Sequence, residues 1–462
     1  MNLSQRIKLS LASRRPRTQA FRPAVESVES RVVMSVMDAG GSQYVLNIMN
    51  HQVYESDAGG SYHSVGLNIA QIGVDRGGFL YALGLDNKVY EHDSGSKWRV
   101  DGGGVSGIGV DRAGYLYALG LDHQVYEHLS GTNWQVDGGG ISMMGVDRGG
   151  YLYALGIDSI VYEHDSGTNW HADGGGVSQM VVDRAGYLYG LAYDHQVYAH
   201  VDNASWQVVG SQMASMTVDR GGFVYTLGLD SNVYEHDGGA IWHVDGGGVT
   251  QLGSDRGGYV YALATDGKVY EHLSAAAWQI DNIKINAIGF DRGGYFYALG
   301  LDHNVYEHDS GTNWHTDGGG VTQLAVDAGG FVYALATDRK VYEHLAGTAW
   351  QVDASGVSEI GVDYTGRLYG LTFIDQLVIQ HDQGTAWHAV GGSIIHTGVD
   401  RGGVLYALNF ADHQIYQHDG ADVWHPIRNN VAQMFVTNGI LYATDLNNHV
   451  YREDGLSWTF VS

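Results

Sequence analysis

The sequence predicts an all-β protein, a β-propeller built of twelve four-stranded blades. Three observations carry this prediction: a unit of about 36 residues recurs along the chain, each unit reads as four short strands, and no window has helical periodicity. The unit is clearest in 110–140, VDRAGYLYALGLDHQVYEHLSGTNWQVDGGG. Thr437 stands at the anchor position of the twelfth unit, and an aspartate stands there in the others: Asp38, Asp75, Asp111, Asp147, Asp183, Asp219, Asp255, Asp291, Asp327, Asp363 and Asp400.

Each unit supplies its strands in a fixed order. An apolar run such as 72–74 ends at Asp-Arg-Gly-Gly, and Tyr-Leu-Tyr-Ala-Leu follows with the alternation of a strand. We expect a two-residue turn next, written Asp-Asn at 86–87 and Asp-His at 122–123, because such residues tolerate positive φ. Strands of the Gln-Val-Tyr-Glu-His and Trp-Gln-Val-Asp type complete the unit, and Gly-Gly-Gly leads to the next one.

Neighbouring units alternate between two kinds from Asp111 to about His388. One kind reads Glu-His-Leu…Trp-Gln, as in 127–135, and the other reads Glu-His-Asp…Trp-His, as in 163–171. The larger repeating unit is therefore a pair of blades, which predicts an even number of blades.

Composition and charge argue against several chemistries and partners for this chain. Glycine accounts for 68 of 462 residues, about twice the usual ~7 %, and cysteine is absent, so disulfides and thiol chemistry are excluded. Residues 1–31 carry seven basic and two acidic side chains. The other residues carry 18 basic against 49 acidic side chains, a net charge of −31. Nucleic acid is therefore not expected as a partner, because phosphate binding needs a basic surface.

The basic segment 1–31 is interpreted as an export leader, separate from the repeats. It has no apolar core of an ordinary signal peptide, and no segment of the chain has the ~20 apolar residues of a membrane span. The stretch FRPAVESVESRVVMS resembles a leader motif of exported bacterial surface proteins, with Val25 and Val28 where that motif often has Leu. We therefore expect a secreted or cell-surface protein, with a cytoplasmic protein carrying a basic, disordered arm as the alternative.

The repeats resemble the tectonin family. The likeness lies in GFLYALGLDNKVYEHDSGSKWRVDGG at 78–103 and its copies, and VYEHDSGTNW also resembles the Glu…Trp hairpin of fucose-binding lectins. An Arg of those lectins has no counterpart here. The resemblance implies six-bladed rings, glycan binding and no catalysis. We therefore expect two rings, 32–247 and 248–462, with one continuous twelve-bladed ring as the alternative, since no linker interrupts the period.

The second turn of the blade is the first candidate ligand site. Its histidines stand at expected hairpin tips beside the Gly-Gly-Gly crossovers, where bare backbone allows a ligand to approach closely. The candidate binding residues are His51, His123, His195, His303, His413, His449, Asp122, Gly138 and Gly139.

Two further columns of residues have structural interpretations beside functional ones. The Trp column could stack on sugars, but one aromatic per blade is also typical of packing between blades. The Glu-His column is expected to form hydrogen bonds between blades, and the arginines of the Asp-Arg-Gly-Gly turns are expected to sit in turns closed by the preceding carboxylate. The secondary candidates for ligand binding are Glu91, Trp98, Glu127, Trp134, Glu163 and Trp170.

The sequence favours a multivalent, non-catalytic, lectin-like binding protein whose partners are glycans or glycoconjugates. A protein-interaction scaffold that uses the acidic faces is the alternative. An enzyme is not expected, because an active site gathers unlike groups at one spot and nearly every polar residue here is a repeated one. No cofactor or metal motif is present, and no calcium loop has the required spacing.

Overall fold

The structure is a computed structural model in which the strands of every repeat can be followed. It describes residues 34–39, 42–47, 50–56, 61–201, 205–274, 277–310, 313–346, 349–363, 365–382, 385–418, 423–437, 439–453 and 457–461. The proposed leader 1–31 lies outside these residues. Among the residues described, no helical segment has the length and apolar character needed to span a bilayer.

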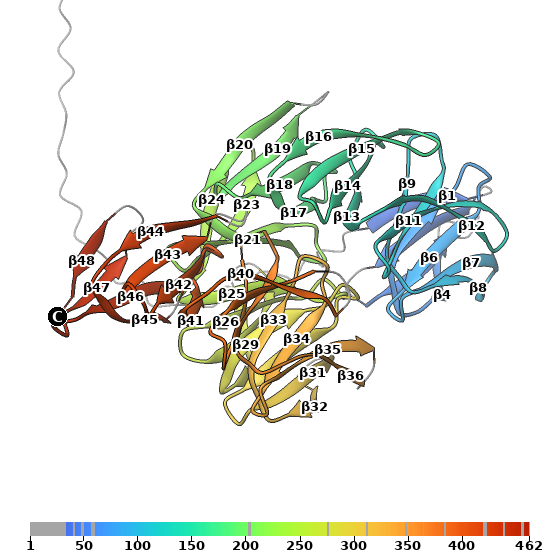
Figure 1. Cartoon of the computed structure of the whole chain (residues 1–462). Coiled ribbons are helices and arrows are strands. Elements are labelled where there is room, and N and C mark those ends of the chain that lie inside the picture. The colour runs from blue at the N-terminus through green and yellow to red at the C-terminus, as the bar shows by residue number, and fades with distance from the viewer. Residues whose placement is uncertain are drawn as a thin grey trace, which may run out of the picture. The chain divides into compact units, whose positions relative to one another are not determined.

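The described chain forms twelve four-stranded antiparallel sheets, each made of four consecutive strands (Figure 1). This confirms the all-β class and the four strands per repeat. In chain order the sheets are β1–β4 (34–66), β5–β8 (69–103), β9–β12 (105–139), β13–β16 (141–175), β17–β20 (177–211), β21–β24 (213–247), β25–β28 (249–283), β29–β32 (285–319), β33–β36 (321–355), β37–β40 (357–391), β41–β44 (394–428) and β45–β48 (431–460). The division of these sheets into two rings stays a prediction.

The third sheet shows how one repeat becomes one blade. Its strands are β9 (Val105–Val110), β10 (Leu116–Gly120), β11 (Gln124–Ser130) and β12 (Asn133–Gly139). Every residue of β10 is buried, on both faces of the strand. A strand covered on both faces needs apolar or small side chains at every position, which is why it reads Leu-Tyr-Ala-Leu-Gly.

Apolar packing joins each blade to the following one. One core cluster combines Tyr117, Leu119 and Val125 of the third sheet with Leu152 and Ala154 of the fourth. Clusters of the same kind join neighbouring sheets along the chain. Each large side chain buried in this way contributes about 1.5–3 kcal/mol, so a blade derives much of its stability from its neighbours.

The second turn differs from the two-residue turn expected from sequence. Three residues, 121–123, connect β10 to β11, and only the last of them, His123, has a positive φ (64°). The His123 N–H donates to Gly120 O at 3.1 Å, and the N–H of Gln124 donates to Asp122 Oδ1 at 3.2 Å. The prediction of 122–123 as the turn pair was wrong, because the backbone bond from His123 to Gly120 places Leu121 and Asp122 at the centre of the turn.

The Asp-Arg-Gly-Gly turn is closed by its aspartate, as predicted. Asp75 Oδ1 accepts the N–H groups of Gly77 and Phe79 at 2.8 and 2.9 Å. The next residue reaches the following repeat: the N–H of Arg76 donates to Gly114 O at 2.7 Å. The turn therefore also links one repeat to the next.

We expect Gly114→Ala to destabilise the protein by about 1–3 kcal/mol, because it combines a strained φ with a steric clash. Gly114 has φ +81°, and an added Cβ would lie 2.7–2.9 Å from Arg76 backbone and Cβ atoms. Gly139→Ala is the control, since its Cβ meets nothing within 4 Å. Urea unfolding midpoints measure both variants. Equal midpoints would contradict the role assigned to this turn.

Candidate functional site

A pocket of about 600 Å³ lies between the second and third blades. One wall is the end of β8 (Lys97–Gly103) and the crossover, 102–104; the opposite blade supplies Asp122, Tyr126 and Trp134, and Arg292 also reaches it. The pocket therefore combines bare backbone, two aromatic rings, a carboxylate and a guanidinium group.

Glycine keeps the backbone wall of this pocket open. A Cβ at Gly103 would meet only Lys88 Cγ, at 3.7 Å, and one at Gly104 would meet nothing within 4 Å. Gly102 lies against the indole, because its Cβ would be 3.4 Å from Trp134 Nε1. Larger residues at 103 and 104 would occupy the space that a ligand would need.

The polar groups of the pocket are held in place by hydrogen bonds. The Tyr126 hydroxyl donates to Asp122 Oδ2 at 2.5 Å, and this bond, together with burial, raises the pKa of Tyr126 to about 12. The Trp134 indole N–H donates to Asp101 O at 3.3 Å. Trp134 thus offers its ring rather than its N–H, and the Asp122 carboxylate can accept hydrogen bonds from a ligand.

The same elements recur in the next repeat at the positions predicted from sequence. Gly138 lies against the following indole, its Cβ position 3.3 Å from Trp170 Nε1, while Gly139 has nothing within 4 Å. The hydroxyl of Tyr162 donates to Asp158 Oδ2 at 2.7 Å. A site built from these groups is therefore a repeated site.

The second-turn histidines are tied to the backbone of the crossover. The ring of His123 is half-buried, and its Nδ1 lies 2.9 Å from Ile141 O. Its Nε2 lies 3.4 Å from Arg292 Nη1, five repeats away, at the edge of the pocket. The Nδ1 contacts of the other predicted histidines are Ile69 O for His51 (3.2 Å), Met213 O for His195 (3.1 Å), Val321 O for His303 (3.0 Å) and Asp445 Oδ2 for His449 (3.1 Å), while the His413 ring lies 6.0 Å from that of Phe410.

The Glu-His column lies at the interface between blades. His128 Nε2 is 2.6 Å from Gly131 O and 3.3 Å from Asp101 Oδ2 of the preceding blade, and its ring centroid is 4.8 Å from that of Trp134. Of the secondary candidates Glu127 and Trp134, only Trp134 lines the pocket.

The other secondary candidates occupy equivalent places in neighbouring blades. Glu91 pairs with Arg99, Trp98 donates to Val65 O at 2.7 Å, Glu163 accepts from Tyr153 at 3.2 Å, and Trp170 donates to Asp137 Oδ2 at 3.1 Å. Sequence reasoning missed Tyr126, although a tyrosine four residues after the turn aspartate is a visible signal.

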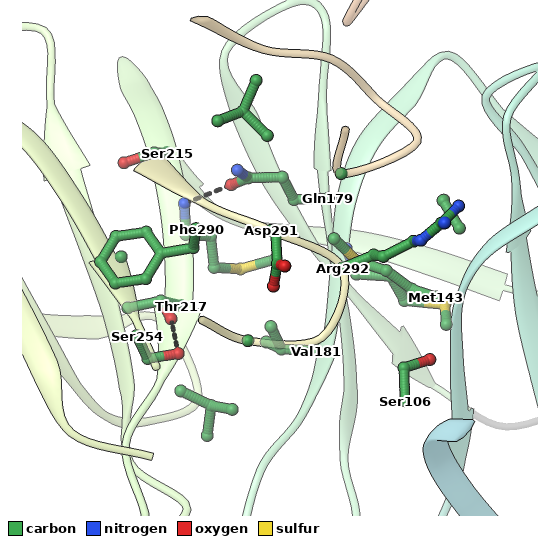
Figure 2. A pocket seen from close by; sticks show the side chains of 18 of the residues that line it. Ser106, Met143, Gln179, Val181, Ser215, Thr217, Ser254, Phe290, Asp291 and Arg292 are labelled. Atoms are coloured by element: carbon green, nitrogen blue, oxygen red, sulfur yellow. Dashed lines mark hydrogen bonds between the residues drawn. The ribbon is translucent and has the colours of Figure 1, made fainter. Parts of the chain in front are cut away.

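A second, larger cavity of about 1450 Å³ is lined by the first strands of the blades and by Asp-Arg-Gly-Gly turns (Figure 2). Asp291 and Arg292 reach it from one such turn, and Gln179 from β17 (Val177–Val182). Hydroxyl pairs also line it, such as Thr217 and Ser254 at 2.6 Å. Among its polar groups, Gln179 Oε1 accepts the N–H of Met216, whereas Ser215 Oγ has no hydrogen-bond partner among the described residues.

Comparison with known proteins identifies no family. No protein-family model matches the chain, and no curated protein matches it. Similar solved structures include the extracellular domain of the putative one component system BT4673 from B. thetaiotaomicron (9 % identity, 93 % of this chain, 77 % of that chain, TM-score 0.31). They also include virginiamycin B lyase from Staphylococcus aureus (7 %, 51 % and 93 %, 0.31) and YCF48 bound to D1 peptide (12 %, 48 % and 86 %, 0.29). At these values the likenesses carry no argument about the site.

Asp291 provides a test of the cavity's electrostatics. Burial raises the pKa of its carboxyl group, although the Tyr295 N–H, 2.8 Å from Oδ1, favours the ionised form. A raised pKa means that the folded chain holds the proton more tightly than the unfolded chain does. Stability therefore falls as pH rises through the folded pKa, and the ionised carboxylate costs stability at neutral pH.

We expect Asp291→Asn to be at least as stable as wild type at neutral pH, because the amide oxygen can still accept from Tyr295. The advantage should shrink as pH falls toward the ordinary value of 3.8. Thermal unfolding across this pH range measures the difference. A variant that is less stable at neutral pH, with the same pH dependence as wild type, would contradict the assignment.

Proposed function

We propose that this protein is a non-catalytic, multivalent glycan-binding protein whose sites are the pockets between blades. The observation that carries the proposal is the repeated pairing of an indole and a carboxylate with an open glycine backbone, as in Trp134, Asp122 and 102–104. A volume of about 600 Å³ is within the range of small-molecule sites, ~300–1,000 Å³.

The chemistry of these groups suits a sugar ring. The apolar face of a pyranose stacks on the Trp134 indole, and its hydroxyls donate to the Asp122 carboxylate and accept from nearby N–H groups. Each site is expected to bind weakly, because the pocket is open and offers few polar groups to a sugar. Equivalent sites formed by the same groups in other blades would give avidity to a glycan surface without a strong single site.

Non-catalytic binding agrees with the composition of the described pocket lining. Its polar side chains are Asp101, Asp122, Tyr126, Thr132, Trp134 and Arg292. The hydroxyl nearest a carboxylate is that of Tyr126, whose raised pKa makes it a poor nucleophile at neutral pH. We also propose, on the resemblance of the leader, that the protein acts outside the cell.

Gly103→Ile should abolish binding in the pocket between the second and third blades. Position 103 corresponds to 283 in the seventh repeat, where the sequence already has Ile, so a β-branched residue is compatible with the strand. We expect the free energy of unfolding to change by less than about 0.5 kcal/mol. A glycan array with the full chain identifies the sugar, and the number of sugars bound per chain should fall by one in the variant.

The variant His123→Asn tests whether the ligand binds in the pocket or at the second-turn histidine. Asn87 occupies the equivalent position with φ 60°, so the turn is retained. We expect binding to persist in His123→Asn and to be lost locally in Gly103→Ile; the reverse result would assign the ligand to the histidine.

Binding of basic proteins, weakened by salt and unaffected by sugars, would instead support an interaction scaffold.

A further inference from the structure

Within the described part of the chain, three blades of the Trp-His kind each gather a glutamate, a histidine and an aspartate. In each set the ligand atoms lie within 4.8 Å of one another. The sets, which we call the acidic triads, are Glu163, His171 and Asp173; Glu235, His243 and Asp245; and Glu307, His315 and Asp317.

Strand pairing brings the first two members of each triad together. Glu163 of β15 (Ile160–Ser166) lies directly opposite His171 of β16 (Asn169–Gly175), and the other two triads have the same register. The distances from His Nε2 to Glu Oε2 are 3.8, 3.4 and 3.5 Å in chain order. A metal bonded to both atoms at about 2.1 Å would hold its ligands at such a separation.

A second carboxylate orients the histidine. Nδ1 of His171 lies 3.1 Å from Asp165 Oδ2, and Nδ1 of His243 lies 2.8 Å from Asp237 Oδ2. In the neutral imidazole, Nδ1 then carries the hydrogen, and Nε2 presents its lone pair to the glutamate. A proton on Nε2 would let it donate to the glutamate, and a cation between the two groups would satisfy both acceptors instead. A carboxylate behind a ligating histidine is also the usual outer partner of zinc sites.

The aspartate of each triad supplies an independent observation. Its side chain is fully buried, and Oδ2 accepts the indole N–H of the next blade, at 2.9 Å for Asp173 and Trp206. Oδ1 of Asp173 has no hydrogen-bond partner, and the same holds for Asp245 and Asp317. A buried carboxylate oxygen without a partner is costly, and a cation would remove that cost where a histidine completes the donor set.

We propose that each acidic triad binds a divalent transition cation of the Zn²⁺ class. Nε2 of the histidine and one oxygen from each carboxylate make three protein ligands, a donor set that suits zinc and not calcium. The histidines are 46, 44 and 40 % exposed, which leaves the fourth coordination position open to solvent.

The alternate blades are built-in controls. In the third blade Glu127 lies opposite Gln135, and Asp137 Oδ1 is likewise buried without a partner. Two carboxylates are thus present in both kinds of blade, and the histidine with the aspartate behind it distinguishes the triads. Position 129, which corresponds to Asp165, is an exposed Leu.

The test is zinc binding by the metal-stripped full chain, measured by calorimetry at neutral pH. We expect three tight sites per chain, and their loss in the variant His171→Gln/His243→Gln/His315→Gln. This variant should fold, because glutamine occupies the position in neighbouring blades. Asp165→Asn/Asp237→Asn should weaken two of the three sites by about 10–100-fold.

Two further variants decide between a built site and general binding by surface histidines. His388→Gln should change nothing: His388 has the outer carboxylate, with Nδ1 3.0 Å from Asp382, but it faces Gln380 and lacks the triad aspartate. Leu129→Asp/Gln135→His should add a fourth site. The proposal is overturned if the triple variant binds as much zinc as wild type, or if His388→Gln loses as much as a triad variant.

Discussion

The structure depends on the bond that each repeat makes to the next through its first turn. The N–H of the residue after the anchor aspartate donates to a glycine carbonyl of the following repeat, for example Arg112 to Gly150 at 2.7 Å. Where alanine replaces arginine, at Ala328, the bond to Gly366 is kept at 2.7 Å. The backbone bond is therefore the fixed element, and glycine is required because the acceptor turn has a positive φ.

The arginine side chains add to this link and are not free to hold an anion. The guanidinium of Arg112 lies 4.2 Å from the ring centroid of Tyr151, and its counterparts stack on the aromatic residue of the following repeat in the same way. Such a contact at a partly exposed site contributes about 0.5–1 kcal/mol. Seven of the eight repeated arginines are thus explained by packing between repeats, while Arg401 donates from Nη1 to Leu229 O at 2.8 Å.

A polar seam runs beside the apolar core at interfaces between blades, such as that between the fourth and fifth blades. In it the Trp indole of one blade donates to the preceding blade, and the histidine of the same hairpin lies against that blade's aspartate and tyrosine. The glycine-walled pocket and the acidic triads both involve the fourth strand of a blade. Both also involve the buried aspartate at one repeat position, which is Asp101 in the pocket and Asp173 in the first triad. One element of packing therefore positions both proposed sites.

The fold was predictable because the sequence patterns that specify its strands and turns are periodic. The strands and the aspartate-closed first turn follow from patterns that twelve copies repeat. The second turn was not predicted in detail, because Asp122 and His123 were interpreted as its two central residues, whereas the Asp122 side chain accepts the Gln124 N–H and His123 is the residue with a positive φ.

The triads escaped sequence reasoning because of a β-bulge. Ser166 pairs with Asn169, so counting back from the turn would place His164 opposite His171. The register shifts between His164 and Ser166, which places Glu163 there instead. The alternation of the blades was visible from sequence. The pairing of the histidine with a glutamate was not, because it depends on the extra residue of the β-bulge.

The alternation itself supports a specific chemical role for the histidine. In six blades, aspartate precedes the histidine by six residues, as in 165 and 171; in three others, leucine precedes glutamine by the same spacing, as in 129 and 135. A histidine whose Nε2 binds a ligand needs an acceptor for its Nδ1–H, whereas glutamine does not. Both positions are exposed, so packing does not require the exchange. The two residues change together because one orients the other.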